Sequence, residues 1–331
     1  MRAPRTVALR PLPGQRLAIS RTDRIGDVKI VVAGGSGALG RRLCADLAGR
    51  GHEVVVLTRT PRPGPYRQVQ WDGRTVGAWA AELAGAAVVN LAGELVDRRP
   101  TRANIELLTR SRVEPTLALV AAAARLDEPV PVWLQASTTA IHGDAGEQLI
   151  DEDTPPADGP PQMAGVARAW EEAASGAPAH RLVVLRTSIV LDRDTPALDR
   201  LALLVRLGLG GRIADGRQWF SWIHVEDWLR IARLVLEPAD SGTPPSGVLL
   251  ATAPNPVRNS ELMAGLRSAL HRPAAPPTPA PMVRLGAVLL RTDPALALTG
   301  RRAVSSTLAT AGFEFVHPEL GGALADLYPR S

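Results

Sequence analysis

The sequence predicts an α/β protein with a doubly wound parallel sheet and a smaller, mostly helical C-terminal lobe. Three observations lead to this fold class. Short apolar runs typical of buried strands alternate with helical segments from residue 29 onward. A glycine-rich turn follows the first of these strands and opens the first helix. The alternation weakens after residue 191, and a proline-rich stretch at 274–281 precedes the last helical segments.

The first elements form one βαβ unit. Residues 29–33 (KIVVA) have the continuous apolar pattern of a buried parallel strand. The segment 41–50 has apolar residues at helical spacing, and Gly51 follows it where helices favour glycine. A second apolar strand is expected at 52–57, so the unit spans about thirty residues.

The same alternation continues along the chain. We expect further strands at 86–91, 130–136, 181–185 and 248–252, and a short strand or loop at 219–224. We expect helices at 79–83, 104–124 with a kink near Pro115, 162–174, 225–236, 260–270, 305–311 and 320–327. Asn259 or Ser260 is the expected N-cap of the helix at 260–270.

Composition excludes several classes of protein. The chain has 331 residues, a net charge of +5 and no apolar run long enough to span a membrane. Residues 1–28 hold six arginines and two aspartates without interleaved aromatic residues, which favours a flexible Arg-rich tail over a nucleic-acid-binding arm. The single cysteine, Cys44, excludes a disulfide framework, and the scattered histidines indicate no metal site. A cytoplasmic location fits this cysteine usage.

The glycine-rich turn predicts a dinucleotide site. Its glycine spacing allows a tight turn, a close approach of the backbone to a pyrophosphate, and close packing of the helix on the sheet. The N-terminus of the helix adds free N–H groups for the phosphates. The predicted cofactor residues in the turn are Gly34, Gly35, Ser36, Gly37, Ala38, Leu39 and Gly40.

The end of the second strand favours NADP(H) over NAD(H). NAD-binding proteins place an acidic residue there to hold the ribose 2′-hydroxyl. This chain has Thr58 and Arg59 instead, and a guanidinium can pair with the 2′-phosphate.

Several longer stretches resemble the extended short-chain dehydrogenase/reductase superfamily, and within it the "epimerase family protein" group. The similarity covers residues 29–327 and includes the stretches 90–94, 111–112, 170–171, 218–224 and 253–257. The resemblance implies a Rossmann-like NADP-binding domain at 29–250 and a small helical domain at 274–327 that serves as a substrate lobe. It also implies further cofactor-lining residues: Thr58, Arg59, Asn90, Leu91, Ala92, Gly93, Arg112 and Arg186.

The chain departs from that superfamily in its catalytic residues. The usual Tyr–Lys pair would fall at Met163 and Ala167, and neither side chain can move a proton. The group commonly has Gly-Tyr-Tyr-Gly where this chain has residues 140–143. Two candidate catalytic residues remain in and just before this stretch. Thr138 can hydrogen-bond a substrate oxygen. His142 is either a proton-transfer group or an ordinary hydrogen-bonding residue.

An aromatic cluster predicts a substrate cleft. Trp219 and Trp222 lie close together in a chain with only 4% aromatic residues. They either line the cleft or pack the two lobes together. His224 and Asp227 follow in the same stretch, and we expect them to be structural partners.

Together these features predict an NADP(H)-dependent oxidoreductase or epimerase-like protein that acts on an unidentified small molecule. The missing Tyr–Lys pair keeps open an alternative, a non-catalytic NADP(H)-binding sensor or scaffold. We expect no nucleic-acid or membrane partner, and a homodimer by resemblance alone.

Overall fold

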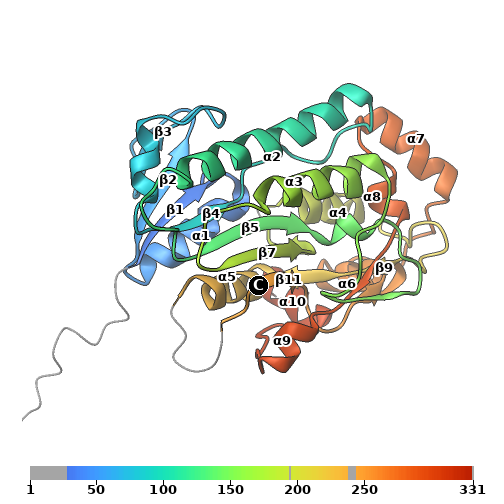
Figure 1. The fold of residues 1–331 in the computed structure, drawn as a ribbon. Helices are drawn as coiled ribbons and strands as arrows, with labels where there is room; N and C mark the ends of the chain where they lie inside the picture. The colour runs from blue at the N-terminus through green and yellow to red at the C-terminus, as the bar shows by residue number, and fades with distance from the viewer. Residues whose placement is uncertain (1–27, 194, 238–243, 330–331) are drawn as a thin grey trace, which may run out of the picture.

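The computed structural model describes residues 28–193, 195–237 and 244–329. The predicted tail at 1–28 therefore lies almost entirely outside the described residues. Within them the fold class is confirmed: a seven-stranded, fully parallel sheet has helices on both faces (Figure 1). The strand order is β11 (Gly247–Ala251), β7 (Leu182–Thr187), β5 (Trp133–Thr138), β4 (Ala87–Asn90), β1 (Lys29–Ala33), β2 (Glu53–Thr58) and β3 (Arg67–Gln70).

Two apolar cores cover the two faces of this sheet. Because neighbouring residues of a strand face opposite ways, Ile30 and Val32 join one core and Val31 joins the other. The first core is closed by α1 (Ala38–Gly49) and α5 (Val225–Leu236). The second is closed by α2 (Arg102–Ala123), which runs through Pro115 as one helix, and α3 (Val166–Ala174) packs beside α2 on the same side (Figure 1).

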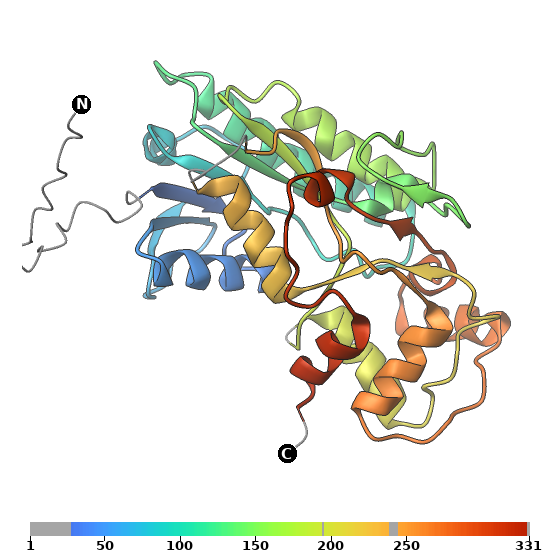
Figure 2. The ribbon, with the colours of Figure 1, turned by 90° about the horizontal axis from the view of Figure 1, so that it is seen from below.

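A third core forms the C-terminal lobe. It consists of α4 (Pro196–Arg206), α6 (Asn259–Ala269) and α10 (Leu320–Leu327), which lie side by side in Figure 2. Trp222 is completely buried among them.

Short elements connect the lobe to the sheet. The short strands pair as β8 (Ile189–Leu191) with β10 (Trp222–His224), β9 (Trp219–Phe220) with β12 (Val257–Arg258), and β6 (Leu149–Ile150) with β13 (Arg302–Ala303). The remaining helical segments are η1 (Ala78–Leu83), η2 (Thr139–His142), η3 (Pro161–Gly165), α7 (Ala280–Leu290), α8 (Ala295–Leu298) and α9 (Ser306–Thr310). In the described part of the chain, no helix is long and apolar enough to cross a membrane.

The structure differs from the predicted elements at several places. β3, α4, α7 and α8 were not predicted, because β3 is a polar edge strand and prolines begin α4 and α7. The expected linker at 274–281 overlaps the first turn of α7. Asn259 begins α6 instead of capping it, and its Oδ1 accepts a hydrogen bond from the Ile213 amide at 2.8 Å.

The carboxylate of Glu152 links the start of α9 to the edge strand of the sheet, β11. Glu152 accepts hydrogen bonds from the Leu250 amide of the edge strand (3.1 Å) and from the Ser306 amide at the start of α9 (2.9 Å). The hydroxyls of Ser305 and Ser306 also donate to it. Leu308 of α9 then packs into the first core. Within residues 274–327, α9 therefore packs on the sheet and α10 packs on the lobe.

The variant Glu152→Gln tests this attachment. Burial alone would raise the pKa of Glu152, but hydrogen bonds from Ser305, Leu250 and Ser306 outweigh it and lower the pKa. A carboxyl group whose folded pKa lies below its unfolded value of about 4.3 stabilises the fold above that pH. This contribution is lost as the pH falls through the folded pKa. We expect Glu152→Gln to cost about 1–3 kcal/mol of unfolding free energy at neutral pH, and less in acid.

Urea unfolding at neutral and acidic pH measures this difference. The exposed Glu53 at the start of β2 provides the control variant, Glu53→Gln. An equal loss for Glu152→Gln at both pH values would show that the ionised carboxylate does not hold the segment.

Candidate functional site

The glycine turn at 34–40 lies at the carboxyl end of β1, and the backbone around it leaves no room for side chains at Gly34 and Gly40. Gly34 has φ of +83°, and a Cβ there would lie 2.6 Å from the Leu91 carbonyl oxygen. A Cβ on Gly40 would lie 2.3 Å from the Gly34 carbonyl oxygen. These glycines let the turn press against the end of β4 and let α1 press against the turn.

Gly37 is a glycine for a different reason. It is the N-cap of α1, and its N–H donates to the Gly34 carbonyl at 3.0 Å. A Cβ there would meet just one atom of the described structure, the Gly34 oxygen at 3.3 Å. The space in front of the turn is therefore open. No acidic residue lies in the first turn of α1, so the positive end of the helix faces this space.

The side chain of Asn90 stabilises the loop that follows β4. This side chain is completely buried, and its Nδ2 donates to Thr116 Oγ1 (2.8 Å) and Gln135 Oε1 (3.0 Å). Its Oδ1 accepts a hydrogen bond from the Ala92 amide at 3.2 Å. Asn90 thus fixes the backbone of the loop at Leu91, Ala92 and Gly93, and both of its polar atoms have partners within the protein.

Arg112 supports the same loop from α2. Its guanidinium donates to the carbonyls of Glu94 (2.9 Å) and Leu108 (3.1 Å) and lies over the Trp170 ring. Burial lowers the pKa of Arg112 to about 10, opposed by the charge of Glu94. Because a Cβ on Gly93 would lie 3.1 Å from the guanidinium carbon, the loop and Arg112 are packed directly together.

The end of β2 presents a free positive charge. Thr58 is half-buried, and Arg59 is exposed with no ion pair in the described chain. On α1, Arg41 donates from Nη1 to the Ser36 carbonyl at 2.7 Å and so also lies beside the turn. Arg41 was not among the predicted residues, although its position in the first turn of a helix that follows a glycine turn could have indicated it.

Arg186 is placed differently from the prediction. Its guanidinium forms two hydrogen bonds of 2.9 Å with the Glu171 carboxylate, and its Nη1 lies 3.4 Å from His142 Nε2. Ser137 also donates to Glu171. This buried network joins β5, β7 and α3, and each of the three nitrogens of the Arg186 guanidinium has a partner within it.

His142 is held inside the same network. It is 5% exposed, and its Nδ1 lies 3.2 Å from the Pro155 carbonyl oxygen, so that nitrogen donates and Nε2 accepts from Arg186. Burial and then the charge of Arg186 lower the pKa of His142. Both ring nitrogens are engaged and the ring is neutral, which is an arrangement for structure and not for proton transfer to a substrate.

Thr138 remains available at the carboxyl end of β5. It is half-buried, and its Oγ1 accepts a hydrogen bond from the Ala140 amide at 3.1 Å. Its own hydroxyl proton has no acceptor in the described chain, so the group can donate to a substrate oxygen.

The guanidinium group of Arg301 lies beside Met163, the position at which the resemblance places the usual tyrosine. Met163 in η3 and Ala167 in α3 are both buried. Arg301, from the C-terminal segment, approaches the sulfur of Met163 with Nη2 at 3.3 Å. The sequence did not indicate this residue, because Met163 and Arg301 are far apart in the chain.

The two tryptophans have different environments. The prediction that Trp222 contacts a substrate is wrong, because the side chain is 0% exposed and its indole donates to the Asn255 carbonyl. Trp219 is half-buried, lies between the guanidinium groups of Arg258 and Arg302, and donates to Glu147 at 3.0 Å.

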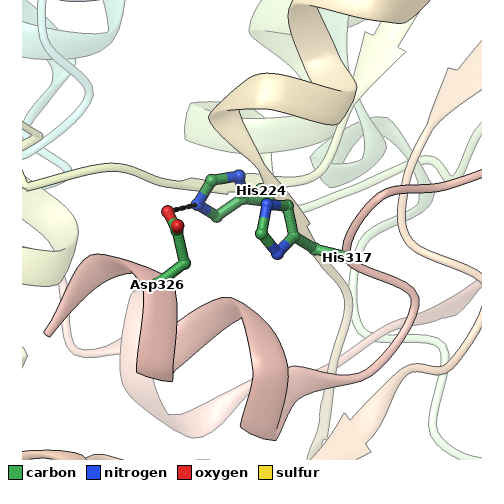
Figure 3. Close-up of side chains that lie close together, drawn as sticks. All are labelled: His224, His317 and Asp326. Atoms are coloured by element: carbon green, nitrogen blue, oxygen red, sulfur yellow. Dashed lines mark ion pairs between the residues drawn. The ribbon is translucent and has the colours of Figure 1, made fainter. Parts of the chain in front are cut away.

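A second polar cluster links α5 to the C-terminal segment (Figure 3). His224, His317 and Asp326 bring their ligand atoms within 4.8 Å of one another. However, His224 Nδ1 accepts from the Glu226 amide, so a neutral ring carries its proton on Nε2, 3.3 Å from Asp326. Asp227 accepts hydrogen bonds from the Val316 and His317 amides. Both His224 and Asp227 therefore hold the C-terminal segment, but through different groups, and no hydrogen bond joins the two side chains in the described chain.

Comparison with known proteins gives consistent matches along the whole described chain. Residues 30–251 match a family described as "NAD dependent epimerase/dehydratase family", and residues 278–327 match a domain of unknown function, DUF1731. The chain is 34% identical over 305 residues to the epimerase family protein SDR39U1 of Bos taurus, covering 91% of this chain and 99% of that protein.

Solved structures extend the similarity to three dimensions. The human epimerase family protein SDR39U1 with NADPH has a TM-score of 0.79 and 32% identity, covering 92% of this chain and 100% of that one. A nucleoside-diphosphate sugar epimerase from Corynebacterium glutamicum has a TM-score of 0.72 and 28% identity, covering 92% and 59% of the two chains.

The crowding at Gly40 gives a direct test of the turn. Gly40→Ala should cost about 1–3 kcal/mol of stability, because the new methyl group would collide with the Gly34 backbone. Gly49→Ala, in the same helix and with no atom within 4 Å of the new Cβ, should leave stability unchanged or raise it by up to about 1 kcal/mol. Thermal unfolding without cofactor compares the two. A wild-type melting temperature for Gly40→Ala would contradict this packing.

Proposed function

The chain belongs to the NAD dependent epimerase/dehydratase family, and from this premise we propose that it binds NADP(H) and acts as an oxidoreductase or epimerase-like enzyme on a small molecule. The observation that supports NADP(H) most directly is the pair of side chains at the end of β2, Thr58 and Arg59. This pair offers the free guanidinium of Arg59 and no carboxylate, which suits a 2′-phosphate and not a 2′-hydroxyl.

The residues present fit a dinucleotide. The open space before Gly37 and the N-terminus of α1 suit a pyrophosphate, which a Cβ at that position would obstruct. Leu91, Ala92 and Gly93 would line the cofactor through their backbone, with Asn90 and Arg112 as positioning residues beneath them. The solved structure of the human relative contains NADPH, which is consistent with this assignment.

In the proposed reaction, bound nicotinamide would supply or accept the hydride at its C4 position. Thr138 would donate a hydrogen bond to the substrate oxygen that gains or loses charge. Neither Met163 nor Ala167 can transfer a proton, and His142 is engaged on both ring nitrogens. The proton that accompanies the hydride would therefore come from solvent or from the substrate itself.

The same observations favour one alternative, a non-catalytic NADP(H)-binding sensor or scaffold. An oxidoreductase consumes NADPH, an epimerase interconverts substrate isomers without net consumption of the cofactor, and a sensor does neither. Turnover of NADPH with any member of a panel of small carbonyl compounds, lost in Thr138→Val, would support the enzyme. Tight NADPH binding with neither loss of its absorbance nor isomerisation of any compound in the panel would support the sensor.

Replacing Arg59 tests the cofactor assignment. Loss of a hydrogen bond to a charged group costs about 1.5–3 kcal/mol, so Arg59→Ala should weaken NADPH binding about tenfold or more and leave NADH binding unchanged. Isothermal titration with each cofactor gives both dissociation constants.

Arg125 supplies the matched control. Arg125 is exposed and follows the C-terminal end of α2, whereas the loop after β4 leads into the N-terminal end of that helix. Arg125→Ala therefore removes the same charge without touching the proposed site. Equal weakening of NADPH binding by both variants, or equal weakening of NADPH and NADH by Arg59→Ala, would contradict a specific 2′-phosphate contact.

A further inference from the structure

We propose that Arg301 binds an anionic oxygen group of the substrate, a carboxylate or a phosphate, and that the substrate of this protein is therefore an anion. This inference deepens the proposed function and rests on it for the identity of the site. It is carried by the position of Arg301 and by the absence of a carboxylate bonded to its guanidinium group in the described chain.

The backbone around Arg301 is fixed by contacts with two other segments. A Cβ on Gly300 would lie 2.4 Å from the Trp219 nitrogen, so the two backbones touch. The Gly300 amide donates to Asp144 Oδ1 at 3.1 Å, and the Arg301 amide donates to the Trp219 carbonyl at 3.0 Å. Arg302 then begins β13. These contacts determine where the Arg301 side chain starts.

The guanidinium itself has no strong acceptor. Its Nη2 contacts the sulfur of Met163, a weak acceptor, and its Nε is buried without a hydrogen-bond partner. Burial lowers the pKa of Arg301, opposed by the charge of Asp144. Within the described residues, no carboxylate oxygen lies within the 4.0 Å of an ion pair.

Other well-buried arginines in the structure are satisfied by the protein. Arg186 has two hydrogen bonds to Glu171, and Arg233 has two to Asp46. Arg112 has the carbonyl of Glu94 in the loop after β4 and that of Leu108 in α2. A buried cation without such partners is costly, because its lost hydration is not replaced. A ligand that brings a negative charge would remove this cost.

The surroundings point to an anion next to the reaction site. η2 directly follows Thr138 at the carboxyl end of β5, and η3, which contains Met163, packs against η2. Burial and the charges of Arg186 and Arg301 lower the pKa of His142, and the charge of Glu171 raises it. Because Arg186 is hydrogen-bonded to Glu171, Arg301 is the cation here without a bonded carboxylate. Arg301 thus brings a fixed cation to the place where the resemblance puts a tyrosine and a lysine.

The test measures binding of two probes, acetate and inorganic phosphate, to the full chain loaded with NADPH. Thermal unfolding at constant ionic strength gives an apparent dissociation constant for each probe. We expect at least one probe to stabilise the wild type, Arg301→Gln to raise its dissociation constant at least about tenfold, and Arg301→Lys to keep part of the effect. Acetate alone would identify a carboxylate, and phosphate alone a phosphate.

Arg284 on α7 is exposed, has no partner in the described chain, and supplies the control. Arg284→Gln should bind both probes like the wild type. The proposal is overturned if neither probe stabilises the wild type, or if Arg301→Gln and Arg284→Gln weaken the probe equally.

A second measurement separates binding from a structural role. Arg301→Met removes an unpaired buried charge, so the ligand-free variant should melt at a higher temperature than the wild type. A lower melting temperature would mean that the guanidinium supports the fold. NADPH binding, measured separately by titration, should change less than about twofold in Arg301→Gln. If the wild type binds no NADPH, the proposed function fails, while probe binding without cofactor still tests Arg301.

Discussion

The contact between the glycine turn and the end of β4 determines where everything else in the site lies. β1 is paired with β2 on one side and with β4 on the other, so the chain connections diverge on either side of it. In open parallel sheets, ligands bind at such a point, beyond the carboxyl ends of the strands. Here the crevice is lined by backbone pressed together: Gly34 touches Leu91, and the Leu91 amide donates to the Ala33 carbonyl at 2.9 Å. A side chain at either crowded glycine would separate these elements.

Around this backbone contact, the buried polar side chains divide into two groups. Most are fully engaged and hold elements together, as Asn90 does for the loop after β4 and Glu171 does for β5, β7 and α3. Two partly buried groups at the carboxyl edge keep unused bonding capacity: the hydroxyl of Thr138 and the guanidinium of Arg301. Protein interiors seldom leave polar groups without partners, so these two groups mark where a ligand would complete the structure. The exposed Arg59 lies at the same edge. The three groups lie at the ends of β2 and β5 and beside η3.

The sequence indicated local features well and distant contacts poorly. The first βαβ unit, the glycine turn and the α/β fold class depend on residues that are neighbours in the chain, and the structure confirms the fold class. The environments of Trp222, Arg186 and His142 depend on elements that come together only in the folded chain, so periodicity could not show that Trp222 is core or that Glu171 engages Arg186. Arg301 is the extreme case, because its neighbours Met163 and Trp219 belong to separate segments.

The central claim is that the carboxyl edge of this sheet recognises the 2′-phosphate of NADP(H) through the end of β2. Phosphorus NMR of NADP⁺ bound to the protein tests it most directly, because a monoester phosphate loses its second proton with a pKa of about 6 in water. A guanidinium beside it favours the dianion, so the bound 2′-phosphate signal should keep its dianionic position through mildly acidic pH and titrate normally in Arg59→Ala. A bound signal that titrates in the wild type as it does in free NADP⁺ would contradict the claim.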